Sequence, residues 1–105
     1  MTLGAKQREF TQMLGQLICY AYSIGYEMSL GRGSVSEAAN EADGGHKDSL
    51  HMLGLAQDYN LFKGARYLSD GRGHDVLHDY WDKLGGAERI KNDMNHYSYA
   101  HNGMR

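Results

Sequence analysis

The stretch Ser49-Leu-His-Met-Leu-Gly-Leu-Ala-Gln-Asp58 organises the fold that we predict for this chain of 105 residues. Gly54 predicts a bend within it, because glycine adopts tight-turn conformations at little steric cost. After the bend, residues 55–62 are apolar and alternating, and they predict the central strand of the chain. Alternation assigns the side chains to two faces, with Ala56, Asp58 and Asn60 on one and Leu55, Tyr59 and Leu61 on the other.

Helical and strand patterns alternate on both sides of this stretch and predict an α+β fold. Apolar residues at three- and four-residue steps indicate a first helix over residues 2–23, ended by Gly25. Ser34, with Glu37 three positions later, forms a capping box that predicts a second helix over residues 35–42. We expect a third helix over residues 74–84 and further short strands over residues 26–30, 67–68 and 95–99.

Composition narrows the class of protein. With 105 residues, of which 41% are hydrophobic and 23% charged, the chain predicts a single globular domain over residues 1–105, and we favour a monomer. A net charge of -2 gives no basic excess, which argues against nucleic-acid binding. No apolar run approaches the ~18 residues of a membrane span, and no secretory signal is recognisable. We therefore expect synthesis in the cytoplasm without membrane insertion. The single cysteine, Cys19, lies in an apolar helical run and is expected to be buried and unreactive.

Two separate fragments carry metal-ligating side chains. The first supplies His51 and Asp58, and the second, Asp93-Met-Asn-His96, lies near the end of the chain. His51, Asp58 and His96 fall on different predicted elements, as ligands that surround one ion must, and zinc accepts both imidazole and carboxylate. A catalytic zinc site keeps its fourth position open for water. Asp93 would then lie beside that water as a general base.

Two alternatives stay open on these residues alone. Strand propensity disfavours Asp58, and a buried hydrogen bond would account for this residue as well as a metal would. His74-Asp-Val-Leu-His78 also places two histidines at helical spacing, similar to the H-E-x-x-H motif of zinc proteases. We expect these two histidines on the solvated side of the third helix, opposite its apolar face of Val76, Leu77, Tyr80, Trp81 and Leu84. Surface or hydrogen-bonded roles are expected for His46, His78 and His101.

The two fragments together resemble the zinc D-alanyl-D-alanine carboxypeptidase and L-alanyl-D-glutamate endopeptidase superfamily. The likeness extends from about residue 25 to the C-terminus and rests on Ser49-Leu-His51, Asp58 and Asp93-x-x-His96. The runs Gly-Leu-Ala-x-Asp-x-Asn-Leu-Phe and Asn-His-Tyr-Ser are similar to those of short phage endolysin-like members. Many relatives carry Trp directly before the last histidine, where this chain has Asn95.

The resemblance implies a fold and a set of roles. The fold would be Hedgehog/D,D-peptidase-like, a small antiparallel sheet with helices packed on one side. One Zn2+ per chain would be held by His51, Asp58 and His96, with Asp93 as the catalytic acid and base. The resemblance also implies that Arg32 faces the substrate carbonyl and the developing oxyanion, and that Ser49 helps to hold the substrate.

The function expected from this likeness is zinc-dependent hydrolysis of the peptide stem of bacterial peptidoglycan. The enzyme would be an L-alanyl-D-glutamate endopeptidase-like phage endolysin, made in the cytoplasm and acting on the bacterial cell wall. Two alternatives stay open. One is a D-alanyl-D-alanine carboxypeptidase, and the other is a non-catalytic, metal-stabilised wall-binding or virion module of the same fold.

Overall fold

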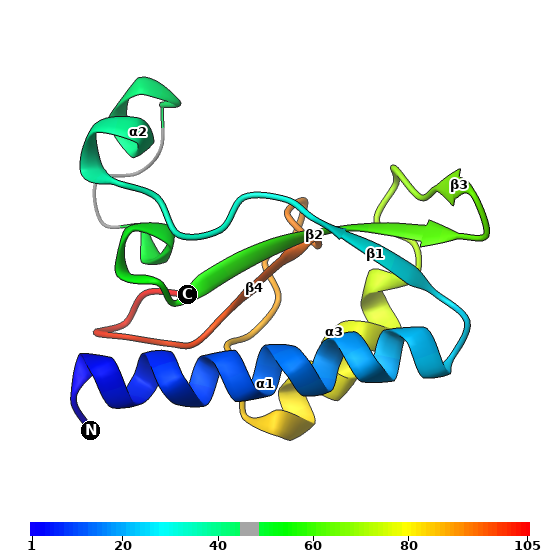
Figure 1. Cartoon of the computed structure of the whole chain (residues 1–105), viewed down its shortest axis with the longest axis horizontal. Helices are drawn as coiled ribbons and strands as arrows, with labels where there is room; N and C mark the ends of the chain where they lie inside the picture. Colours follow the sequence, from blue (N-terminus) through cyan, green and yellow to red (C-terminus); the bar gives the residue numbers. More distant parts are fainter. Residues whose placement is uncertain (45–48) are drawn as a thin grey trace.

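The computed structural model describes residues 1–44 and 49–105, and its helices alternate with short strands (Figure 1). In chain order the elements are α1 (Leu3–Ser23), β1 (Glu27–Leu30), α2 (Glu37–Ala42), the 3-10 turn η1 (Leu50–Leu53), β2 (Ala56–Lys63), β3 (Arg66–Tyr67), α3 (His74–Leu84) and β4 (His96–Ser98). The predicted α+β class is confirmed, because a small antiparallel sheet packs with helices.

β2 is the central strand, and it pairs antiparallel with three others. β1 lies opposite residues 59–62 on one edge of β2. On the other edge, β4 lies opposite residues 56–58 and β3 lies opposite residues 62–63. In this register Asp58 is the direct partner of His96, so both side chains project from the same face of the sheet.

The helices α1 and α3 cover the opposite face of the sheet. Tyr59, Leu61 and Tyr97 of the sheet meet the buried side chains of the two helices in one core, and the helical members include Phe10, Met13, Leu17, Ala21, Leu77 and Trp81. The short helix α2 lies on the other side of the sheet (Figure 1). The expectation that helices pack on one side therefore holds for α1 and α3, and α2 departs from it.

The helix ends agree with the sequence in two cases of three. The Thr2 hydroxyl accepts a hydrogen bond from the Ala5 N–H at 3.1 Å, and this N-cap begins α1 as predicted. The bounds predicted for α3 are also confirmed. The capping box at Ser34 is wrong, because Ser36 caps α2. Val35 stays outside the helix since its N–H donates to the His51 carbonyl at 3.1 Å.

The sequence predictions of burial need correction at three places. Cys19 is exposed, and Val76, assigned to the apolar face of α3, is 36% exposed. His74 and His78, expected in solvent, are 2% and 0% exposed. The reason is Tyr97, whose ring stacks on His78 with centroids 4.1 Å apart, so β4 covers this side of α3. His46 lies outside the described residues.

None of the helices in the described ranges combines the length and the hydropathy that crossing a membrane requires.

Candidate metal centre

Three side chains from three elements converge on the face of the sheet opposite the core. His51 comes from η1, Asp58 from β2 and His96 from β4. One ligand atom from each lies within 4.8 Å of the others, and they form the single such cluster of three within residues 1–44 and 49–105. These are the three ligands predicted from the sequence, and this buried group can hold a metal ion.

The spacing of the ligand atoms fits tetrahedral coordination. The Asp58 Oδ1 atom lies 3.5 Å from His51 Nε2 and 3.1 Å from His96 Nδ1. Metal–ligand bonds of ~2.1 Å at tetrahedral angles hold neighbouring ligand atoms ~3.4 Å apart. The imidazole rings of His51 and His96 lie with centroids 5.2 Å apart and are inclined by 66°. The rings therefore approach the carboxylate from different directions.

The tautomer of His51 leaves a lone pair aimed at the carboxylate. His51 Nδ1 lies 3.0 Å from the Gly33 carbonyl oxygen, which can only accept a hydrogen bond, so Nδ1 carries the proton. In the neutral ring Nε2 then bears a lone pair, and it faces Asp58 Oδ1 at 3.5 Å. Only a cation or an added proton makes this contact favourable. A carbonyl partner on the remote nitrogen is also the usual way to orient a histidine ligand.

His96 is held less completely than His51. Its Nδ1 faces Asp58, while its Nε2 is buried without a hydrogen-bond partner among the described residues. His96 is only 8% exposed, so its orientation is set by packing and by the strand register. If His96 binds a metal through Nδ1, its proton lies on Nε2. This is one of the two tautomers in which a neutral histidine binds metals.

The electrostatics favour an ionised carboxylate at Asp58. Burial alone would raise the pKa of Asp58, but hydrogen bonds and charge from His51 and His96, when these rings are protonated, outweigh burial and lower the pKa to about 2. A negative charge therefore persists between two imidazoles at neutral pH. This charge attracts a divalent cation more strongly than two imidazoles alone would.

Glycines allow a second chain segment to lie against Asp58. The Gly31 N–H donates to the Asp58 carbonyl at 2.9 Å, and the Asp58 N–H donates to the Arg32 carbonyl at 2.8 Å. A Cβ atom at Gly31 would lie 3.1 Å from the Asp58 carbonyl oxygen, and one at Gly33 would lie 2.8 Å from the side chain of Gln57. The small residues therefore let Arg32 reach the rim of the site.

The remaining predicted site residues line the same pocket, of about 480 Å3, as the three ligands. Asp93 is exposed, and its carboxylate makes no hydrogen bond or ion pair within the described part of the chain. Arg32 is anchored by Asp43 at 2.6 Å and by Asn40 at 3.3 Å. The Ser49 hydroxyl accepts a hydrogen bond from the His51 N–H at 3.2 Å.

The two histidines of the alternative metal motif on α3 form hydrogen bonds elsewhere in the fold. His74 Nδ1 lies 2.7 Å from the Tyr97 hydroxyl, and His78 Nε2 lies 2.7 Å from the Met94 carbonyl. Neither histidine lines the pocket of the three ligands. The two histidines of the HxxxH motif on α3 therefore contact Tyr97 and the segment that contains Met94, and they do not belong to the three-ligand site.

Sequence reasoning missed part of the site. The Gly33 carbonyl orients His51, and the pocket also includes Asn40, Met104 and Arg105. Arg105 forms an ion pair with Glu88 at 3.0 Å. A backbone carbonyl carries no sequence signal. Asn40 carried only a weak signal in the sequence, as a polar residue on a short predicted helix. In the structure Asn40 is 2% exposed.

Comparisons of this chain with family models, with curated proteins and with solved structures return no match.

Proposed function

We propose that this chain is a zinc-dependent peptidase that cuts the peptide stem of bacterial peptidoglycan in the cell wall. Its fold and site would be those of the Hedgehog/D,D-peptidase-like superfamily that the sequence resembles. The observation that carries the proposal is the convergence of His51, Asp58 and His96 in an open pocket that also holds Asp93.

The donor set supports zinc. Two imidazoles and one carboxylate are a known ligand combination for this ion, and three protein ligands leave a fourth position free. The lone pair on His51 Nε2 also faces the negative carboxylate of Asp58, and a cation between them would stabilise this arrangement. When bound, zinc would supply Lewis-acid polarisation and lower the pKa of a water to around 7.

Asp93 is the residue that we assign to proton transfer. Its carboxylate lines the pocket and has no partner in the described part of the chain, so both oxygens can accept a proton. The carboxylate takes one proton from the attacking water as the new C–O bond forms. It then delivers that proton to the amine as the peptide C–N bond breaks, so the group ends in its starting state.

Arg32 and Ser49 are assigned to the substrate. Asp43 and Asn40 fix the guanidinium of Arg32, and its positive charge favours the negative oxygen that develops on the scissile carbonyl. The Ser49 oxygen accepts from the His51 N–H, and its own O–H has no acceptor among the described residues, so it can donate to a substrate carbonyl.

A D-alanyl-D-alanine carboxypeptidase is the second candidate. Arg105 lines the same pocket, and a guanidinium there suits the free terminal carboxylate that such a substrate carries. A non-catalytic metal-stabilised module would need the three ligands but would have no use for a free carboxylate at Asp93. The placement of Asp93 therefore favours an enzyme over the module.

Substitution of Asp93 tests the mechanism. Asp93→Asn should lower the turnover of a defined muropeptide by at least about 100-fold, because it removes the general base and acid. The variant should bind one equivalent of zinc as the wild type does. Glu27→Gln is the matched control, since Glu27 is an exposed acid on β1, and it should leave turnover unchanged.

Mass spectrometry of the products distinguishes the two bonds. A new N-terminal D-glutamyl peptide indicates the endopeptidase, and free D-alanine indicates the carboxypeptidase. Turnover by Asp93→Asn at the wild-type rate would refute the assigned mechanism. Zinc binding without turnover of either substrate by the wild type would favour the non-catalytic module.

A further inference from the structure

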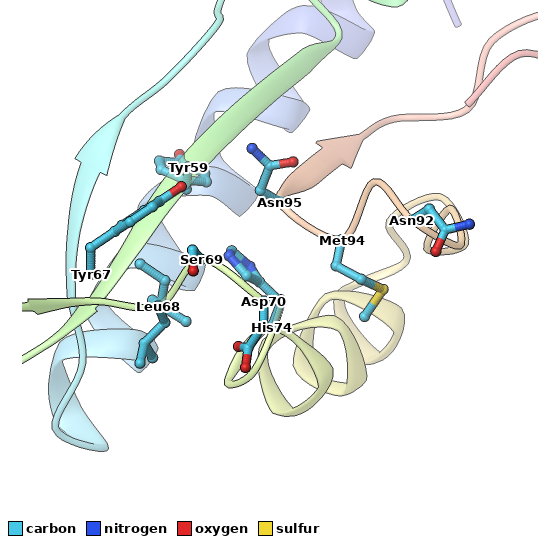
Figure 2. Close-up of a pocket in the computed structure, with 11 residues that line it drawn as sticks. Tyr59, Tyr67, Leu68, Ser69, Asp70, His74, Asn92, Met94 and Asn95 are labelled. Atoms are coloured by element: carbon cyan, nitrogen blue, oxygen red, sulfur yellow. The ribbon is translucent and has the colours of Figure 1, made fainter.

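A second pocket, of about 410 Å3, lies on the core side of the sheet (Figure 2). Successive side chains of β2 point to opposite faces of the sheet. Asp58 therefore faces the pocket of the three ligands, here called the metal pocket, while Tyr59 lines the second pocket. The segment 92–95 forms a wall between them. It contributes Asp93 to the metal pocket and Asn92, Met94 and Asn95 to the second pocket.

The imidazole of His74 stands in this second pocket with a free donor (Figure 2). Tyr97 is fully buried, and its phenol carries a proton that needs an acceptor. This hydroxyl has no acceptor other than His74 Nδ1 among the described residues, so it donates to that nitrogen. In the neutral ring the proton of His74 is then on Nε2, which makes no hydrogen bond within residues 1–44 and 49–105.

Tyr59 provides a second polar group of the same kind. The residue is 1% exposed and lines the pocket, and its hydroxyl makes no hydrogen bond within the described part of the chain. Two side chains that are more than nine-tenths buried therefore bring unpaired polar groups to one pocket. Neither His74 Nε2 nor the Tyr59 hydroxyl is sealed from solvent, so each can form a hydrogen bond to a ligand or to water in the pocket.

The other lining groups indicate a neutral ligand. Asp70 is the one charged residue in the described lining, and Arg72 forms an ion pair with its carboxylate at 2.6 Å. Uncharged hydroxyl and amide groups come from Ser69 and Asn95. Tyr67 adds an exposed aromatic ring at 53% accessibility, and this ring points across the pocket toward Tyr59 (Figure 2). Aromatic rings offer a flat apolar face together with a polar edge.

We propose that this second pocket binds an N-acetylated sugar ring. Such a ring carries no charge, presents hydroxyls and an amide carbonyl for hydrogen bonding, and has an apolar face of C–H groups that can lie against Tyr67. The His74 Nε2–H and the Tyr59 hydroxyl would donate to its oxygens. The volume falls within the ~300–1,000 Å3 range of small-molecule sites.

The choice of an acetamido sugar rests on the proposed function. Peptidoglycan carries its peptide stems on N-acetylated sugars, so an enzyme for the stem meets both components together. Because the segment 92–95 separates the two pockets, a sugar in one pocket would lie next to a stem entering the other. The second pocket would thus retain the enzyme on the glycan while the stem is cut.

NMR titration of the 15N-labelled chain with tri-N-acetylchitotriose tests the proposal. The titration is done with a chelator present, so that its result does not depend on the metal centre. We expect saturable shifts of amides in residues 67–74 and 92–95, and none with cellotriose, which lacks the acetamido groups. Tyr67→Ala, at an exposed position, and His74→Asn, which keeps an acceptor for Tyr97, should each weaken binding by about tenfold.

A variant on the opposite face provides the matched control. His51→Ala alters the metal centre and should bind the chitotriose with wild-type affinity. No saturable shift in the wild type, equal binding of cellotriose, or unchanged binding by Tyr67→Ala and His74→Asn would each overturn the sugar site. Cleavage of muropeptides without sugar binding would refute only this inference. Sugar binding without any cleavage would refute only the proposed peptidase activity.

Discussion

The protonation of the buried His74 ring is linked to the stability of the fold. Burial first, and then repulsion from His78 when that ring is also protonated, lower the pKa of His74 to about 4 in the folded chain. In the unfolded chain the pKa returns to about 6.5. Between these two values the unfolded state binds more protons than the folded state. The free energy of unfolding therefore falls as the pH is lowered from about 6.5 to about 4.

We predict that His74→Asn flattens this part of the pH profile. The variant cannot titrate there, so between pH 7 and pH 4 it should lose on the order of 3 kcal/mol less stability than the wild type. Urea denaturation at a series of pH values measures the difference, with a chelator present to exclude loss of metal. Parallel profiles for the two proteins would show that His74 is not held neutral by burial.

The individual site residues differ in how far the sequence reveals them. Asp58 is conspicuous in the sequence because a charged residue in an apolar strand requires a partner, and the register with His96 supplies one. The burial of His74 and His78 was not predictable from α3 alone, since aspartates flank both histidines. Their environment is created by Tyr97, which lies 23 residues after His74 in the chain and belongs to β4.

At the scale of elements, α3 supports the segment that carries Asp93. His78 is fully buried and its Nε2–H donates to the Met94 carbonyl at 2.7 Å. Burial lowers the pKa of His78, which keeps the ring neutral. Met94 lies between Asp93 and His96, so this hydrogen bond fixes the segment that presents both residues to the metal pocket. We therefore assign His78 a positioning role.

Two substitutions at His78 separate the hydrogen bond from the ring contact. His78→Phe keeps the stack on Tyr97 but leaves the Met94 carbonyl unpaired, at a cost of about 1–3 kcal/mol. His78→Gln keeps an N–H donor for that carbonyl. We predict that His78→Phe weakens zinc binding by roughly tenfold or more and that His78→Gln largely preserves it, as measured by competition with a chromophoric chelator.

The outcome at His78 is decided by comparing the pair of variants. Equal zinc affinities for His78→Phe and His78→Gln would contradict a role for this hydrogen bond. Amide shifts of residues 93–96 in NMR spectra of the metal-free proteins supply an independent readout. They should change more in the Phe variant than in the Gln variant.

Patterns within single elements were sufficient to predict most of the elements themselves. Alternation identified β2, and the apolar periodicity together with Gly85 identified α3. The start of α2 was misplaced because two serines, Ser34 and Ser36, compete as caps. The deciding contact is the hydrogen bond from the Val35 N–H to the His51 carbonyl, which depends on a turn fifteen residues later.

At the scale of the whole molecule, the candidate metal centre brings together segments that are distant in sequence. The ligands come from η1, β2 and β4, and the Gly33 carbonyl adds the segment that precedes α2. An unfolded chain does not hold these groups in one place, so a metal ion binds mainly to the folded state. Metal binding should then stabilise the fold as a whole.

We predict that zinc raises the melting temperature of the wild type and of Asp93→Asn, but not of Asp58→Asn. At a free zinc concentration 100 times the dissociation constant, the gain in stability is about 2.7 kcal/mol. For a domain of this size that corresponds to a rise of roughly 10 °C or more. Circular dichroism melts with zinc and with a chelator measure this rise. Asp58→Asn should lose it because the amide removes the negative charge between the two imidazoles.

The same melts distinguish a metal centre from a proton-mediated ion pair. If a proton on His51 compensates Asp58, zinc will leave the melting temperature of the wild type unchanged, and the proposed peptidase loses its basis. An equal zinc shift in Asp58→Asn would place the ion elsewhere on the chain. A shift present in the wild type and in Asp93→Asn but absent from Asp58→Asn requires the ion to bind where His51, Asp58 and His96 converge. In that case Asp93 remains free for proton transfer.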